Sequence, residues 1–110
     1  MANDTYHECI QACFACASEC EACATACLGE EDVKAMVRCI QLDRDCAAIC
    51  LLAAQLMARD SRFAAQFCRL CAEICQACGE ECARHTHMEH CRRCAEACFR
   101  CAEECRRMAG

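Results

Sequence analysis

Residues 9–27 read CIQACFACASECEACATAC, a stretch in which six cysteines stand three or four positions apart. The same spacing recurs along the 110-residue chain, and its nineteen cysteines fall into four runs with eight intervals of four, six of three and one of seven. The mean step of about 3.5 is the repeat of the inward stripe of packed α-helices. The runs are Cys9, Cys13, Cys16, Cys20, Cys23 and Cys27; Cys39, Cys46 and Cys50; Cys68, Cys71, Cys75, Cys78 and Cys82; and Cys91, Cys94, Cys98, Cys101 and Cys105.

These runs predict an all-α fold, an antiparallel up-down-up-down four-helix bundle with a cysteine-lined core. The links around residues 28–32, 59–61 and 84–87 are short, as is usual between antiparallel neighbours in a bundle. A chain of this length and continuous pattern predicts one domain over residues 1–110.

Capping residues predict where the helices begin and end. We expect the first helix to begin at Thr5, in a capping box with Glu8, and to stop at Gly29. The second should run from near Asp32 to about Arg59. The third, capped by Asp60 or Ser61, should run to about Arg84, and the fourth, with a Thr86–Glu89 capping box, should end near Met108.

Charge and composition exclude several classes of protein. The net charge of −5 argues against a nucleic-acid-binding face, and no apolar stretch is long enough to span a bilayer. The polar, acidic start, Met1–Glu8, gives no secretory signal, so we expect a reducing cytosol in which disulfides are rare. With one Tyr, four Phe and no Trp, the metal-free core should be only moderately stable.

Thiols collected on one helical stripe point to a soft metal ion. Thiolates favour Cu(I), Zn(II) and iron–sulfur clusters. A buried zinc tetrathiolate carries two net negative charges, so repeating it along a dry core would be very costly. Each Cu(I) neutralises one thiolate, and shared thiolates let the number of ions approach the number of cysteines. The pattern therefore predicts a non-enzymatic protein that stores and buffers multiple Cu(I) ions per chain.

Other interpretations of the cysteines remain open. A zinc-binding protein and an iron–sulfur electron-transfer protein are the main alternatives, although the loop spacing typical of iron–sulfur sites is absent. Three further alternatives are weaker. Inert packing is a poor explanation for nineteen cysteines on inward positions, and an odd number of cysteines argues against full disulfide pairing. A thiol-redox enzyme is also disfavoured, because the Cys-x-x-Cys motif recurs six times without a strand–helix context.

The three–four register also predicts two different ends for the bundle. Extending the runs brings Tyr6, Met57, Ala64 and Met108 together as an apolar plug. At the opposite end it brings together Cys27 and several neutral thioether and imidazole ligands, which exchange metal more readily than thiolates. We expect this end to be the mouth for metal entry, formed by Met36, His85 and His87, with Met88 and His90 nearby.

The second helix is unlike the others. Asp43 occupies a stripe position between cysteines, where it would ligate metal or form internal hydrogen bonds; alternatively, it turns to the helix boundary to pair with an arginine.

This second helix is also apolar on more than one side. Leu42, Ile49, Leu52 and Leu56 lie beside the stripe, while Val37, Ile40, Ala47, Leu51 and Ala54 continue round another face. The second face predicts a protein partner, most simply another copy of this chain. A flanking stripe of Phe63, Phe67, Leu70 and Ile74 should pack within the chain.

With four cysteine runs, no leader and a histidine-containing turn before the last helix, the whole chain resembles the cytosolic copper storage proteins. The resemblance implies a cytoplasmic four-helix bundle that binds many Cu(I) ions, assembles as a homotetramer and loads near its histidine end. The second helix has fewer cysteines than the other three, which differs from the evenly lined bore that the resemblance implies.

Overall fold

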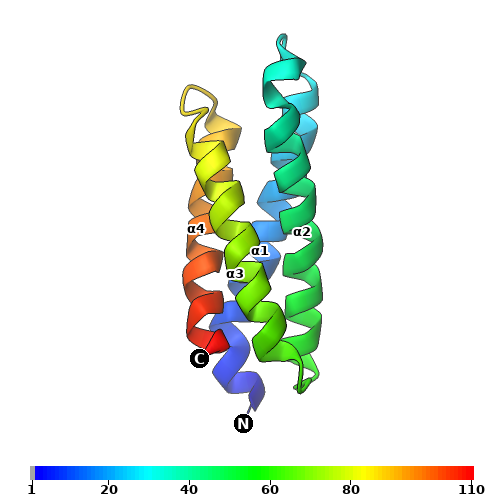
Figure 1. Cartoon of the computed structure of the whole chain (residues 1–110), viewed down its shortest axis with the longest axis vertical. Helices are drawn as coiled ribbons and strands as arrows, with labels where there is room; N and C mark the ends of the chain where they lie inside the picture. The colour runs from blue at the N-terminus through cyan, green and yellow to red at the C-terminus, as the bar shows by residue number, and fades with distance from the viewer. Residues whose placement is uncertain (1) are drawn as a thin grey trace.

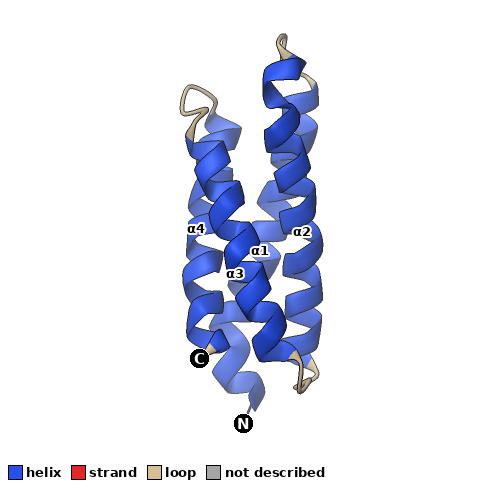
Figure 2. Cartoon of the chain, in the orientation of Figure 1, coloured by secondary structure: helices blue, strands red, loops and turns tan. Residues whose placement is uncertain are grey.

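Four long helices form the fold in the computed structural model, which describes the backbone of residues 2–110 and the side chains of residues 5–110 (Figures 1 and 2). The helices are α1 (Ala2–Leu28), the 3₁₀ turn η1 (Val33–Met36), α2 (Val37–Ala58), α3 (Ala64–Ala83) and α4 (Glu89–Ala109). Within residues 2–110 there is no strand, and none of the helices has the length and hydropathy of a membrane span.

The helices are arranged as an elongated bundle that measures 48 × 17 × 17 Å. α1 packs against α2 and α4, and α3 packs against the same two helices, so consecutive helices are neighbours around the bundle. Both termini and the α2–α3 link lie at one end, and the α1–α2 and α3–α4 turns lie at the other (Figure 1). The predicted antiparallel up-down-up-down bundle is confirmed.

Small residues accompany the cysteines in the core. All nineteen cysteines are at most 1% exposed, and the positions beside them are often buried alanines, among them Ala12, Ala53, Ala54 and Ala102. Large side chains are rare inside; Met36, Met57 and Asp43 have the largest volumes among those fully buried. The short alanine side chains let four helices approach a narrow axis that the sulfur atoms fill.

The helix ends partly contradict the predicted caps. α1 ends at Leu28, before Gly29 as expected, but it begins at Ala2, so Thr5 lies inside the helix and is not its cap. Residues 2–4 contain no glycine or proline that would stop the helix from extending. Asp32 does accept a hydrogen bond from the Ala35 amide, but the turn that it caps is η1, and α2 starts only at Val37.

The link between α2 and α3 is formed differently from the prediction. Asp60 adopts a left-handed conformation with φ of 54°, which aspartate tolerates better than most residues. Its amide donates to the Met57 carbonyl and the Ser61 amide donates to the Leu56 carbonyl, the hydrogen-bond pattern of a Schellman motif. Asp60 therefore terminates α2 and does not cap α3. α3 begins later than predicted, at Ala64, with no side-chain cap.

The Thr86–Glu89 capping box is also wrong. α4 starts at Glu89 after the extended residue Met88, and no side chain caps it. The Thr86 carbonyl instead accepts a hydrogen bond from the Arg92 guanidinium one turn further on. Thr86 and Glu89 have the residue types and spacing of a capping box, but Thr86 lies in the turn before the helix and does not cap it.

Gly79 permits a close contact between α3 and α4. A Cβ at this position would lie 2.7–3.0 Å from three atoms of the Phe99 ring, which is closer than real carbon atoms approach. The ring therefore occupies the space above the glycine. Glycine inside a helix costs about 1 kcal/mol of stability relative to alanine. The chain carries this cost at a position where a larger side chain would collide with the ring.

The apolar residues that flank the cysteine stripe divide between core and surface. On α2, Ala47 and Ala54 are buried, whereas Val37 is 46% exposed and Leu51 is 42% exposed. Leu52 was expected beside the stripe but is also exposed. In and just before α3 the prediction of intrachain packing holds for Phe67 and Ile74 and is wrong for Phe63 and Leu70, which are exposed. The structure describes one copy of the chain, so pairing through α2 stays a prediction.

Candidate metal centre

The nineteen thiols meet along the bundle axis. All are buried and none forms a disulfide. Facing helices bring sulfur atoms within contact distance, as in the pairs Cys9–Cys105 at 3.5 Å and Cys46–Cys75 at 3.5 Å. The inward orientation predicted from the spacing is therefore what the structure shows.

The sulfur atoms form groups of four that share members. In each group the ligand atoms lie within 4.8 Å of one another, a separation that one metal ion can span. Cys16 and Cys46 belong to at least two groups, and Cys20 and Cys98 also belong to at least two. The groups include Cys13, Cys71, Cys101 and Cys105; Cys16, Cys46, Cys50 and Cys75; Cys16, Cys20, Cys46 and Cys98; and Cys20, Cys78, Cys94 and Cys98. Where two neighbouring groups are both occupied, the sulfur that they share must bridge the two ions.

Asp43 lies among the thiols. It is fully buried, and its Oδ1 accepts hydrogen bonds from the thiols of Cys78 at 3.2 Å, Cys94 at 3.3 Å and Cys82 at 3.6 Å. Burial raises the pKa of Asp43 to about 11, and the neighbouring Cys94, Cys78 and Cys39 act in the same direction. Of the two alternatives, the structure adopts the inward stripe position. At neutral pH Asp43 is therefore a protonated, uncharged side chain inside the bore.

Burial also raises the pKa of two thiols near the open end. It raises the pKa of Cys91 to about 12 and raises that of Cys27, with the charge of Cys39 adding to both. Since the thiolate is the form that binds metal, each ion that enters must displace protons from these side chains.

The predicted mouth residues gather at the end that carries the α1–α2 and α3–α4 turns. Met36, His85, His87 and Met88 line one surface cavity of about 510 Å³ together with acidic residues of the α1–α2 turn. Among the lining residues Met36 is buried and His87 is exposed. The ring centroids of His85 and His87 are 6.5 Å apart. The cavity thus places thioether and imidazole groups above the bore.

His90 contacts the sulfur atoms of the bore directly. Its Nδ1 is 3.4 Å from the sulfur of Cys23 and 3.5 Å from that of Cys91. Together with Cys27 these side chains form a further four-ligand group, in which one ligand is nitrogen. His90 was predicted to lie near the mouth and to be a candidate metal ligand, and the structure brings it against the sulfur atoms of Cys23 and Cys91.

Sequence reasoning missed two glutamates that hold these histidines. Glu30 lies 3.0 Å from Nε2 of His90, across 60 residues of sequence. The buried Glu81 lies 3.0 Å from Nε2 of His85, and Arg38 and Arg84 also approach it. The spacing of four between Glu81 and His85 was a signal that could have revealed the second pair.

The opposite end is closed by apolar side chains. Met57 and Ala64 are fully buried, and Tyr6 and Met108 pack partly buried against the core. The predicted plug is therefore present. His7, one residue beyond Tyr6, is exposed.

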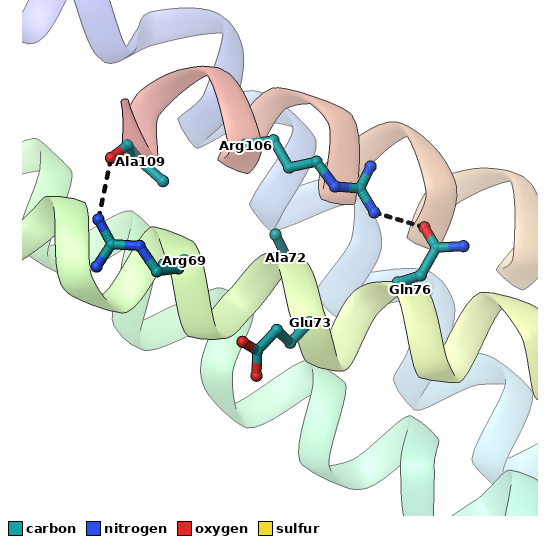
Figure 3. Close-up of a pocket in the computed structure, with 6 residues that line it drawn as sticks. All are labelled: Arg69, Ala72, Glu73, Gln76, Arg106 and Ala109. Carbon is teal, nitrogen blue, oxygen red and sulfur yellow. Dashed lines mark hydrogen bonds between the residues drawn. The ribbon is translucent and has the colours of Figure 1, made fainter.

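A groove outside the bore has no metal-binding character. It has a volume of about 430 Å³ and lies between α3 and α4, and no cysteine lines it (Figure 3). Arg69 donates to the Ala109 carbonyl at 3.2 Å, and Arg106 donates to Oε1 of Gln76 at 2.7 Å. Both guanidinium groups are thus engaged within the chain.

Comparison with known proteins gives consistent matches over nearly the whole chain. The model of the copper storage protein family matches residues 2–110. An uncharacterized cysteine-rich protein of Bacillus subtilis strain 168, YhjQ, is 52% identical over 85 residues, which are 76% of this chain and 79% of YhjQ.

Solved structures agree with that match. The Cu(I)-bound copper storage protein BsCsp3, from Bacillus subtilis, has a TM-score of 0.92 and 49% identity, covering 96% of this chain and 99% of that one. A cytosolic copper storage protein from Streptomyces lividans, in a structure with five coppers, has a TM-score of 0.93 and 41% identity, covering 98% and 94%.

Proposed function

This chain belongs to the copper storage protein family, and from that premise we propose that it stores and buffers multiple Cu(I) ions in the cytosol. The observation that carries the proposal is the continuous series of overlapping four-sulfur groups in a buried bore. The relatives that support it are the Cu(I)-bound protein of Bacillus subtilis and the cytosolic protein of Streptomyces lividans. Residues 1–110 would act as one metal-binding domain without catalytic activity.

Charge favours Cu(I) over Zn(II) in this bore. Four thiolates around each zinc would leave two negative charges at every level of a core from which water is excluded. One Cu(I) for each thiolate leaves the core almost neutral, and bridging sulfurs fit the shared members of the groups. Thiolate ligands also suit Cu(I) by their softness. We therefore expect a capacity on the order of the cysteine count.

Individual residues take different roles in the proposal. All nineteen cysteines would ligate copper, and Asp43 would ligate it or hydrogen-bond to the ligating cysteines. Met36, His85 and His87 would pass Cu(I) from solvent to the outermost thiols, where His90 would supply a nitrogen ligand. We also propose self-association, in a tetramer, through the exposed apolar face of α2, which includes Val37 and Leu51.

Titration of the reduced protein with Cu(I), in competition with a chromophoric chelator, tests the storage function. We expect saturation well above four ions per chain, and saturation at four or fewer would refute it. Cys46→Ser should lower the capacity, because Cys46 belongs to two sulfur groups, whereas the matched control Ala47→Ser changes a buried neighbour outside them and should not. Tighter binding of Zn(II) than of Cu(I) would support the alternative zinc protein.

A further inference from the structure

One carboxylate reaches across the open end to the histidine that faces the sulfurs. Glu30 lies in the turn that follows α1, and His90 lies in the first turn of α4. Oε2 of Glu30 is 3.0 Å from Nε2 of His90, and the other ring nitrogen, Nδ1, faces Cys23 and Cys91. Both side chains are partly buried, with Glu30 32% and His90 15% exposed, so the hydrogen bond is partly shielded from water.

The hydrogen bond decides which nitrogen of the neutral ring carries the proton. A carboxylate can only accept hydrogen bonds, and a neutral imidazole has one N–H group. Nε2 must therefore carry the hydrogen in order to donate to Glu30. The lone pair is then left on Nδ1, which lies 3.4 Å and 3.5 Å from the two sulfur atoms. In the metal-free protein this lone pair can accept a hydrogen bond from either thiol.

We propose that Glu30 is a positioning residue that holds His90 in the Nε2–H form, with Nδ1 directed at Cys23 and Cys91. This inference rests on the proposed storage of Cu(I) in the bore. The outermost group of Cys23, Cys27, His90 and Cys91 is then ready to bind Cu(I) through a neutral nitrogen as well as thiolates. The reverse tautomer would point an N–H at the metal position and block ligation.

Glu30 is suited to this task because of its place in the chain. Its amide donates to the Cys27 carbonyl at 3.2 Å, which fixes Glu30 next to a cysteine of the same group. The contact with His90 also joins the α1–α2 turn to the start of α4. Partners that orient a ligating histidine in this way contribute roughly 10–100-fold to metal affinity in characterised sites.

The tautomer can be measured in the reduced, metal-free protein by long-range ¹H–¹⁵N NMR of the imidazole rings. We expect His90 to be in the Nε2–H form in the wild type. Glu30→Ala should change the ring-nitrogen shifts of His90 by admitting the Nδ1–H form. Glu30→Gln should restore them, because its amide oxygen accepts the same hydrogen bond. Glu31→Ala, which removes a charge from an exposed neighbour in the same turn, is the control.

Occupancy of the site can be followed separately from total capacity. The His90 Nδ1 signal should respond when Cu(I) binds, and competition with a chelator gives the affinity at this group. We expect Glu30→Ala to weaken that affinity roughly 10–100-fold while the total capacity stays the same.

Three results would overturn the role of Glu30. They are an Nδ1–H ring in the wild type, ring shifts that Glu30→Ala leaves unchanged, and an affinity at this group that Glu30→Ala leaves unchanged. A wild-type capacity of four ions or fewer would instead refute storage, and the tautomer measurement on the metal-free protein would still stand by itself.

Discussion

Replacement of Asp43 by asparagine should make the metal-free protein more stable at neutral pH. In the folded state burial raises the pKa of Asp43 from its ordinary value of 3.8 to about 11. Between these two values the folded protein keeps a proton that the unfolded chain has released. The free energy of unfolding must therefore fall as the pH rises through this window.

The size of the effect follows from the width of the window. One proton of difference changes the free energy of unfolding by about 1.4 kcal/mol for each pH unit. Between the ordinary value of 3.8 and pH 7, the wild type loses about 4 kcal/mol. Asparagine does not titrate, although its amide hydrogens meet weakly accepting thiols, which costs about 1 kcal/mol. We expect Asp43→Asn to be about 3 kcal/mol more stable at pH 7 and to lose this advantage near pH 4.

Urea unfolding of the reduced, metal-free protein at pH 5, 6 and 7, followed by circular dichroism, measures these free energies. The wild type should lose about 1.4 kcal/mol for each pH unit relative to Asp43→Asn. The exposed Asp45 provides the control, since Asp45→Asn should follow the wild-type pH dependence. Parallel pH profiles for the wild type and Asp43→Asn would refute a buried, protonated Asp43.

Three other predictions concern the packing, the protons and the mouth. Gly79→Ala should raise the free energy of unfolding by about 1 kcal/mol in a Phe99→Ala background. The gain should be smaller in the wild type, where the Phe99 ring must move to admit the new methyl group. Equal gains in the two backgrounds, measured by urea unfolding, would contradict the contact between Gly79 and Phe99. Cu(I) loading in weak buffer should release protons when the thiols of Cys27 and Cys91 bind, since burial raises the pKa of both; a pH-stat measures this, and loading without acid release would contradict it. His85→Ala combined with His87→Ala should slow Cu(I) uptake several-fold in stopped-flow experiments and leave capacity unchanged, whereas wild-type uptake rates would exclude entry at this end.

The sequence was sufficient to predict the bore because one simple periodicity governs it. Cysteines three and four apart must share a helix face, and four such faces in a short chain can only be buried against one another. Asp43 follows the same periodicity, which is why its inward position was one of two alternatives. The choice between them depends on the hydrogen bonds that Cys78 and Cys94 donate to its carboxyl group, and spacing alone does not define these contacts.

Features that depend on the conformation of the turns could not be predicted in this way. The contact between Glu30 and His90 joins residues 60 positions apart, and it exists only because the α1–α2 turn and the start of α4 lie at the same end of the bundle. Asp60 looked like a helix cap, yet its left-handed conformation ends α2. The exposed Leu52 shows a similar limit, because rotation of a helix by part of a turn moves a flanking residue from core to surface.

Anomalous diffraction at the copper absorption edge, on crystals of the Cu(I)-loaded protein, would locate the stored ions directly. We predict copper peaks at bonding distance from sulfur along the whole axis, from the level of Cys9 and Cys105 to that of Cys23 and Cys91. Copper confined to the mouth or the outer surface, with the inner thiols free of metal, would contradict storage in the bore.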